Sequence, residues 1–317
     1  MNQLSCVTFL QSKCRHNTNM EIKYVKQEEI DKVKWNSCVH YATNGNIFGY
    51  MWYLDHIAKD WDALVEGDYE SVFPLVWRDG PFKRRELHQP SLMRELGVYS
   101  IHLLSQKRVE QFLKAIPAEF RKIDIRLNEQ NQPPAVDGFK VEERQNHQLF
   151  LNRPYEEIAD DYDRALLEQL QLAEDEGLVL TSSLKPEQIA AFYQQHRPRA
   201  QQSEHDFHGM QRVMYNALHR GWGFASSVMN PAGETLAVNF FLYSHGKVIS
   251  FMPVESEAGR AVGAQVYLLN GLIRNHANRP VILDFNTDGR HKLAERFGAR
   301  TNPYYKLYRN TLHFGLF

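Results

Sequence analysis

The chain has 317 residues, which fits two ordinary domains better than one. Apolar residues make up 43% and charged residues 24%, which is typical of a globular protein with a hydrophobic core and excludes a disordered chain. The formal net charge of −1 excludes a strong overall attraction to nucleic acid or to anionic membranes. Any anion that binds must therefore be held by a local cluster of groups.

The cysteines and the first residues point to the cytoplasm. Cys6, Cys14 and Cys38 are odd in number and show no Cys-x-x-Cys pair, so neither a disulfide framework nor a zinc site is indicated. Residues 1–19 contain no apolar segment long enough for a signal sequence, and no stretch of the chain could span a bilayer. We expect a loose tail over 1–19 and ordered structure from Met20 onward.

The first half alternates between strand and helix patterns. In chain order, we expect a strand at 21–26, helices within 27–42 and 47–61, two strands on either side of the turn dipeptide Gly67-Asp68, a helix at 106–115, a strand at 121–128 and a closing strand at 147–154. The second half begins with helices at 155–177, broken once, then 185–197 and 208–221. A three-stranded meander follows within 223–254, then a helix at 262–278, a buried strand at 280–286, a short helix and a final strand.

The two halves end alike. Each has a strand that ends in asparagine, at Asn128 and at Asn286, then a linker, an aromatic residue next to glycine, and a closing strand. This order predicts an internal duplication, with a chance similarity as the alternative. We place the two domains at 20–153 and 154–317.

One loop of the second half has the chemistry of an anion site. Glu255–Gln265, "ESEAGRAVGAQ", leaves a strand and opens a helix, whose first N–H groups are unpaired and lie at the positive end of the helix dipole. Gly259 and Gly263 would let the backbone approach a phosphate, and Arg260 would add charge. The alternative is a plain strand-to-helix turn.

The segment Arg260, Ala261, Val262, Gly263 and Ala264 resembles the Arg/Gln-x-x-Gly-x-Gly/Ala loop of the GNAT acyltransferases, which holds the pyrophosphate of acyl-CoA. The last glycine is missing, and Ala264 is taken as its small replacement. The order of elements after this loop, a helix, a strand, a short helix with "RFGA" and a closing strand, is also that of the GNAT fold.

Two longer segments resemble GNAT-like proteins that are similar to the Fem peptidoglycan-bridge aminoacyltransferases. They are "VFPLVWRDGPFKRRELHQPSLMRELGVYS", residues 72–100, and "LDFNTDGRHKLAERFGA", residues 283–299. The resemblance implies an α+β chain of two tandem GNAT-like domains, each a mixed, mostly antiparallel sheet flanked by helices. It also implies an acyl-CoA or aminoacyl-tRNA donor, and an amine acceptor bound in a cleft of the second domain. The sequence departs from the relatives at "DFNTDG" and in an acidic linker helix that disfavours tRNA.

The transfer of an acyl group to an amine needs a proton acceptor, stabilisation of an oxyanion and protonation of the leaving group. Asp284, at a strand end, is the candidate base or orienting group, with a turn cap as the alternative. Tyr304 and Tyr305 are candidates for the leaving-group acid, and only one of these neighbours can face the cleft. Lys306 is a candidate for contact with a carboxylate or phosphate.

Other polar residues are candidates for substrate contact. Asn239 and Ser250 lie on the meander, whereas Trp52, Gln89 and Tyr99 belong to the first half. Glu255 and Glu257 are either bases or solvated charges. His205, Asp206 and His208 have a metal-like spacing, but no second cluster completes a ligand set, so we expect no metal.

The sequence therefore predicts an acyltransferase that moves an acyl or aminoacyl group from a CoA-type or aminoacyl-tRNA donor to a small-molecule or peptide amine. The alternative is a non-catalytic protein of the same fold that binds a cell-wall precursor or another small ligand. Direct binding of tRNA through residues 78–94 is a weaker hypothesis, because the chain has almost no net charge.

Overall fold

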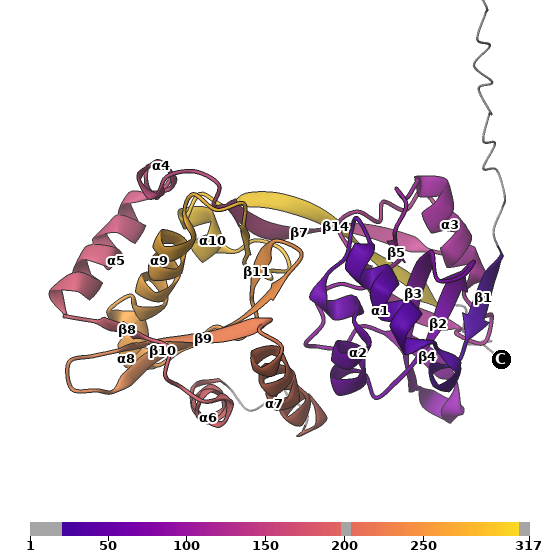
Figure 1. Cartoon of the computed structure of the whole chain (residues 1–317), viewed down its shortest axis with the longest axis horizontal. Coiled ribbons are helices and arrows are strands. Elements are labelled where there is room, and N and C mark those ends of the chain that lie inside the picture. The colour runs from indigo at the N-terminus through magenta and orange to yellow at the C-terminus, as the bar shows by residue number, and fades with distance from the viewer. Residues whose placement is uncertain (1–20, 198–203, 311–317) are drawn as a thin grey trace, which may run out of the picture.

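The computed structural model describes residues 21–197 and 204–310, and the predicted tail at 1–19 lies outside them. Figure 1 shows two lobes, one for each half of the chain, joined by a ribbon of two long strands. The strands are β7, Lys140–Phe150, and β14, Arg300–Asn310, and they run antiparallel along each other. The predicted boundary at 153–154 falls just after β7.

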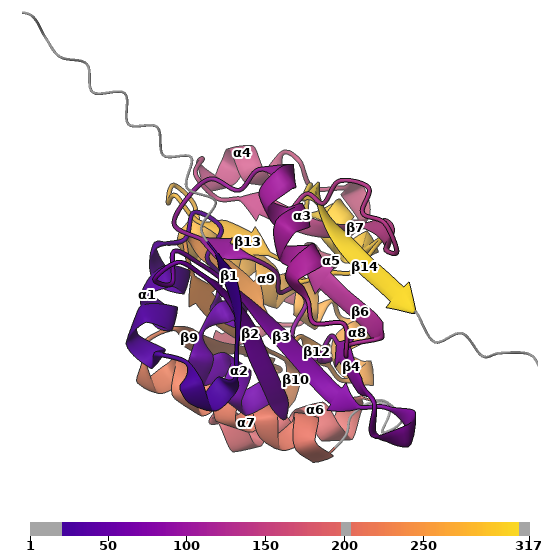
Figure 2. The same ribbon diagram turned by 90° about the vertical axis from the view of Figure 1, so that its right-hand side faces the viewer.

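The first half packs helices on both faces of its strands, with α1 and α2 on one side and α3 on the other (Figure 2). The predicted helix at 27–42 starts only at Lys32, because Asp31 caps it by accepting hydrogen bonds from the N–H groups of Val33 and Lys34. The elements are β1 Ile22–Val25, α1 Lys32–Tyr41, α2 Met51–Ile57, β2 Asp60–Glu66, β3 Ser71–Asp79, β4 Arg85–His88, β5 Tyr99–Ser100, α3 Gln106–Ala115 and β6 Lys122–Leu127, with short 3₁₀ turns at Gln27–Glu29, Ile47–Gly49 and Pro81–Lys83.

The second half follows its predicted order closely. The long helix is broken once, as predicted, because Asp163 caps a new helix by accepting a hydrogen bond from the N–H of Leu166. The elements are α4 Tyr155–Ala159, α5 Arg164–Asp175, β8 Val179–Thr181, α6 Pro186–His196, α7 Glu204–His219, β9 Gly223–Met229, β10 Thr235–Ser244, β11 Lys247–Ser250, β12 Val254–Glu255, α8 Glu257–Ala261, α9 Ala264–His276, β13 Ile282–Asp284 and α10 Lys292–Arg296.

All strands of the described residues belong to one continuous mixed sheet, because the halves exchange their last strands. In the first half β6 runs parallel to β4, and its other neighbour is β14, the last strand of the second half. In the second half β13 runs parallel to β11, and its other neighbour is β7, the last strand of the first half. The two sheets expected from the sequence are therefore fused, and neither is complete without the other half.

The halves repeat one plan: two helices, antiparallel strands, a helix, and a strand parallel to the last of those strands. This repetition is what an internal duplication predicts.

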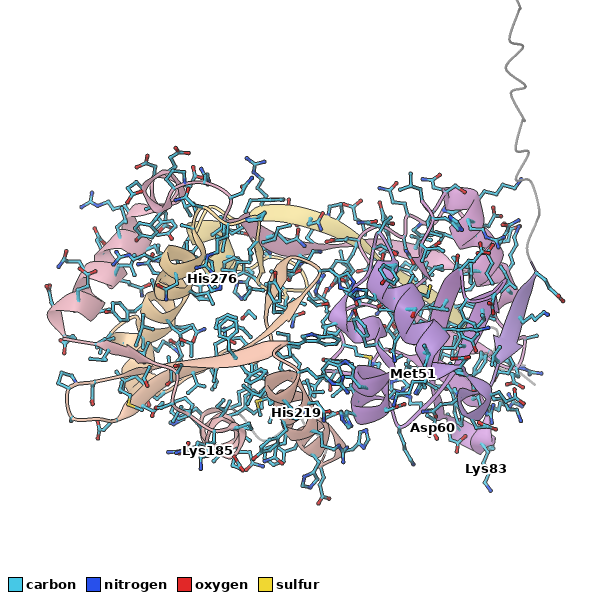
Figure 3. The ribbon with its side chains drawn as sticks, in the orientation of Figure 1. Met51, Asp60, Lys83, Lys185, His219 and His276 are labelled. Carbon is cyan, nitrogen blue, oxygen red and sulfur yellow. The ribbon has the colours of Figure 1, made fainter. Side chains whose placement is uncertain are left out.

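A large hydrophobic cluster joins the halves away from the β7/β14 ribbon. Helix α2 of the first half packs against α7 of the second, and Met51 and His219 are labelled on these helices in Figure 3. The helices come so close at Gly209 that an added Cβ would lie 2.8 Å from the carbonyl oxygen of His56. Burial of this apolar surface fixes the lobes against each other.

We predict that Gly209→Ala destabilises the protein by about 1–3 kcal/mol, because the new methyl group meets backbone that cannot move aside. Gly271→Ala in α9 is the matched control, since its Cβ would meet only the end of the flexible Leu180 side chain. Urea unfolding of both variants measures the difference. Equal stabilities would show that α2 and α7 can separate without cost.

Candidate functional site

A cavity opens in the second half where two parallel strands separate. β11 and β13 pair as far as Ile249 and Asp284, and the chain beyond β11 then turns away so that β12 pairs with β10. The cavity has a volume of about 280 Å³ and lies beside the start of α9. Its lining consists of His196, Arg197, Ser250, Pro253, Val254, Glu255, Arg260, Gln265, Leu269, Phe285, His291 and Leu293.

The loop that enters α9 needs a glycine. Gly263 has φ 70° and precedes the first helical residue, and a Cβ on it would lie 3.1 Å from the Cβ of Gln169 in α5. The Glu255 carboxylate lies against this end of α9, where the backbone N–H of Gln265 donates a hydrogen bond to it. Arg260 Nε lies 3.5 Å from the same carboxylate. Burial raises the pKa of Glu255, and Arg260 and the Gln265 amide partly oppose this.

The cavity holds polar groups that lack partners. The side chain of Gln265 is buried, and among the described residues neither its oxygen nor its nitrogen has a hydrogen-bond partner. Ser250 Oγ accepts a hydrogen bond of 2.8 Å from Asn239 Nδ2, which leaves its own hydrogen available to a ligand. Buried polar groups are nearly always satisfied in native proteins, so the unpaired amide of Gln265 points to a ligand.

His291 presents a hydrogen-bond donor at the cavity wall. Its Nδ1 accepts from the N–H of Ala294 and so caps α10. Burial lowers the pKa of His291, and His147 adds to this effect. A neutral ring with Nδ1 as acceptor carries its hydrogen on Nε2, so His291 can donate there but cannot accept a proton.

The matching gap of the first half is filled. β4 and β6 pair in parallel up to His88 and Asp124, and residues 89–98 then occupy the space between the diverging ends. Gln89 and Leu96 hydrogen-bond to the backbone of Arg126, and Asn128 N–H donates to the carbonyl of Leu96. Among the described residues, this position of the repeated plan is therefore filled in the first half and open in the second.

The same loop sends Arg94 into the other half. Arg94 Nη2 donates to Asp284 Oδ2 at 3.0 Å and Nε donates to Asn286 Oδ1 at 3.1 Å, with both ionic side chains buried. Asn146 and Gln148 of β7 also donate to the Asp284 carboxylate. Burial opposes ionisation of Asp284, but Arg94 and then Lys247, together with these hydrogen bonds, hold its pKa below the usual range.

A second buried acid lies beside this ion pair. Glu95 Oε2 accepts from Arg94 Nη1 at 3.0 Å, and its Oε1 accepts from Asn46 Nδ2 at 3.1 Å. Burial is the largest influence and raises the pKa of Glu95 to about 7, against the attraction of Arg94. Glu129 accepts from Lys247 and from Asn302 in the same interior region.

No protein-family profile matches the sequence, and no curated protein matches it. Solved structures do match over most of the chain. FemX aligns with a TM-score of 0.61 and 12% identity, over 90% of this chain and 97% of that one. L-PGS from Bacillus licheniformis aligns with a TM-score of 0.53 and 11% identity, over 90% of this chain and 93% of that one. A tandem GNAT protein from the clavulanic acid biosynthesis pathway aligns with a TM-score of 0.50 and 13% identity, over 91% of this chain and 98% of that one. The chain has the tandem GNAT, Fem-like fold. The fold class expected from the sequence is confirmed.

Within this GNAT-like fold, the predicted catalytic residues do not line the cavity. Asp284 faces Arg94 and Asn146, whereas the next residue, Phe285, lines the cavity. Tyr304 is fully buried and donates to Asp288 Oδ1 at 2.6 Å, and burial followed by this hydrogen bond raises its pKa. Tyr305, its neighbour on β14, points to the opposite face.

The predicted anion loop lies at the cavity with a different chemistry. Arg260 lines it and faces Glu255, while Ala261 is exposed, Val262 is half-buried and Gly263 and Ala264 are buried at the start of α9. Counted from Arg260, the last position of the GNAT pattern falls on Gln265 and not on Ala264. The pattern is therefore completed by a large polar residue instead of a small one.

The predicted substrate contacts are spread over the molecule. Gln89, Tyr99 and Trp52 lie in the first half. Gln89 accepts a hydrogen bond from the N–H of Arg126, and the Tyr99 hydroxyl donates to Asn46 at 2.9 Å. Trp52 packs on Trp222, and its buried Nε1 has no partner among the described residues. Asn239 reaches the cavity through Ser250. Lys306 pairs with Asp124 at 3.1 Å on the β14/β6 surface.

Sequence reasoning missed Arg94, Gln265 and His291. Arg94 lies inside the Fem-like segment 72–100, where the adjacent charges of Arg94 and Glu95 between Met93 and Leu96 were a signal. Gln265 would have followed from a correct count of the loop pattern, and nothing marked His291.

The described residues contain neither a cluster of metal ligands nor a helix that could span a membrane. Across residues 21–197 and 204–310, no three His, Cys, Asp or Glu side chains come close enough to hold a metal ion. His205 instead contacts the carbonyl oxygen of Ile57, and His208 lies 3.8 Å from Glu204. No helix in these ranges is long and apolar enough to cross a membrane.

We predict that Arg94→Met destabilises the protein by about 3–5 kcal/mol, because it leaves the Asp284 carboxylate buried without its counter-charge. Adding Asp284→Asn should recover part of this loss. Arg290→Met is the control, since Arg290 is exposed and lies 3.9 Å from Glu295. Urea unfolding at pH 7 compares the four proteins, and an equal loss in the single and double variants would contradict the assigned pairing.

Glu95 should make stability depend on pH. Its folded pKa of about 7 lies above the ordinary value, so the folded state binds the extra proton and loses stability as the pH rises from about 4.5 to 7. The free energy of unfolding of Glu95→Gln, relative to that of the wild type, should therefore rise by on the order of 1–3 kcal/mol as the pH increases from 5 to 8. Thermal unfolding across this range tests the difference, in which the contributions of the histidines cancel. A constant difference would rule out the raised pKa.

Proposed function

We propose that the protein is an acyltransferase that moves an acyl or aminoacyl group from a CoA-type or aminoacyl-tRNA donor to a small-molecule or peptide amine. The observation that carries the proposal is the cavity between the separating ends of β11 and β13, beside the start of α9, with the unpaired amide of Gln265 buried in it. Ligand sites are typically concave and mostly apolar with a few convergent polar groups. We also propose a cytoplasmic location, because the three cysteines of the sequence indicate no disulfide framework.

The reaction forms a bond between the amine nitrogen and the acyl carbon and breaks the bond from that carbon to sulfur or oxygen. The amine loses a proton, and the leaving thiol or hydroxyl gains one. Charge develops on the carbonyl oxygen and requires donors. The amides of Phe251 and Met252 both donate to the carbonyl of Phe240, so backbone donors there are already used. We assign the role to the Ser250 hydroxyl and Gln265 Nε2.

We assign to the Nε2–H of His291, which lines the same cavity, a hydrogen bond to the leaving group. Asp284, Tyr304 and Tyr305 remain candidate residues of the reaction. The contacts of Asp284 and Tyr304 favour a positioning role, because each is bound to other side chains of the protein. In that role they hold the end of β13 and the β14 strand in place beside the cavity.

One observation favours the alternative of a non-catalytic binding protein. The acceptor nitrogen of His291 is already used by the N–H of Ala294, and the Asp284 carboxylate is saturated with donors, so neither is free to accept the proton of the amine. A protein of this kind would bind a cell-wall precursor or another small amine without consuming a donor.

A transfer screen separates the two functions. We expect product by mass spectrometry when the protein is incubated with a panel of acyl-CoA esters, charged tRNAs and primary amines. The control is the protein denatured by heat. Binding of an amine without product from any donor would replace the transferase proposal with the binding-protein alternative.

Gln265→Met provides a sharper test, because the two side chains have similar size and the variant loses both polar atoms. Transfer should fall by about 10- to 100-fold if this amide serves the reaction. Stability should be unchanged or higher, because an unpaired buried amide is removed. Gln169→Met in α5 is the control, since Gln169 is outside the cavity lining. Retained activity in Gln265→Met would exclude the assigned role.

A further inference from the structure

We propose that Glu255 determines specificity by closing the amino end of α9 to a diphosphate and making the cavity a site for a primary ammonium group carried on a small apolar group. The inference rests on the proposed function, because it concerns the ligand of the same cavity. Its basis is the position of the Glu255 carboxylate and of the Gln265 carboxamide at the cavity.

The Glu255 carboxylate occupies the place that an anion would need. The N–H groups at a helix start attract negative charge, and here the N–H of Gln265 already donates to Glu255. A diphosphate placed there would lose this donor and meet a like charge at close range. The Arg260 guanidinium, which we expected from the sequence to contact a phosphate, lies against Glu255 instead.

Gln265 adds a steric obstacle. The pattern of a phosphate-binding loop calls for a small residue at this position, so that the backbone can approach the oxygens. The side chain of Gln265 is instead buried in the cavity with both polar atoms unpaired. It therefore fills space that a diphosphate would need, and it offers an oxygen and an N–H to a different ligand.

The charges around the cavity separate into an inner acid and outer bases. Glu255 is the acidic residue of the lining, and its side chain is 25% exposed, whereas Arg260 is 65% exposed. Arg197 is also exposed, and it donates to the Tyr193 hydroxyl at 2.7 Å. His196 and His291 complete the titratable groups of the lining. A cation can therefore pair with Glu255 inside, while an anionic portion of the same ligand faces the arginines.

The remaining lining residues indicate which kind of group carries the ammonium. The lining side chains of Val254, Leu269, Phe285 and Leu293 are apolar. A small aliphatic group would pack against them, and a carbonyl next to it would reach the Ser250 hydroxyl and Gln265. An aminoacyl ester and a simple alkyl amine both present an ammonium group on an apolar chain, and only the first also presents the carbonyl.

Calorimetry at pH 6.5 with the full chain tests the inference with four probes: leucinamide, N-acetylleucinamide, 3-methylbutylamine and coenzyme A. We expect leucinamide to bind at least tenfold more tightly than its N-acetyl form, which lacks the charge. Glu255→Gln should abolish this preference and strengthen binding of coenzyme A. Glu257→Gln is the matched control, because Glu257 is an exposed acid two residues away and outside the cavity lining. Tighter binding of leucinamide than of 3-methylbutylamine would identify the aminoacyl source, and the reverse would identify the simple amine.

Equal binding of leucinamide and its N-acetyl form to the wild type overturns the inference, and this comparison does not depend on the folding of any variant. Tight binding of coenzyme A to the wild type overturns it as well, while leaving acyl transfer intact. A preference for the ammonium probes without transfer from any donor would support the inference and remove the transferase function. The two proposals therefore fail in different experiments.

Discussion

The buried ion pair between Arg94 and Asp284 is the constraint on which the arrangement of the two halves depends. An ionised carboxylate inside a protein is tolerated only when a counter-charge and hydrogen bonds compensate its lost hydration. The counter-charge comes from the first half, and the carboxylate stands at the end of β13 in the second. The halves must therefore keep this register, or Asp284 loses its closest counter-charge.

The same loop explains why the gap between the parallel strands is filled in the first half and open in the second. Residues 89–98 fill the gap between β4 and β6 with backbone and side-chain hydrogen bonds, and they present Arg94 at their centre. In the second half, α8 and α9 follow β12 without such a detour, so the gap between β11 and β13 stays open. The exchange of β7 and β14 then places the filled gap and the open gap in one sheet. One repeat thus supports the site of the other.

The sequence predicted the local elements well, because capping residues and periodic apolar positions act over short range. Asp163 marks the break before α5, and the three strands of the meander, β9, β10 and β11, lie within the expected range 223–254. The strand exchange was not predictable, because the alternation of β14 identifies a strand without naming its partner. Arg94 was missed for a related reason: its function depends on a carboxylate 190 residues away in the chain.

Asp284 and Glu255 are acidic residues at the ends of β13 and β12, and their surroundings shift their pKa values in opposite directions. Arg94 and Lys247 outweigh burial at Asp284 and hold its pKa below the usual range, so that this group stays charged and bound within the protein. At Glu255 burial prevails over Arg260 and raises the pKa. Groups whose surroundings move their pKa values apart are suited to different tasks. Asp284 is therefore fitted to hold the strands in position, and Glu255, with its raised pKa at the cavity wall, is the acid that a ligand can reach.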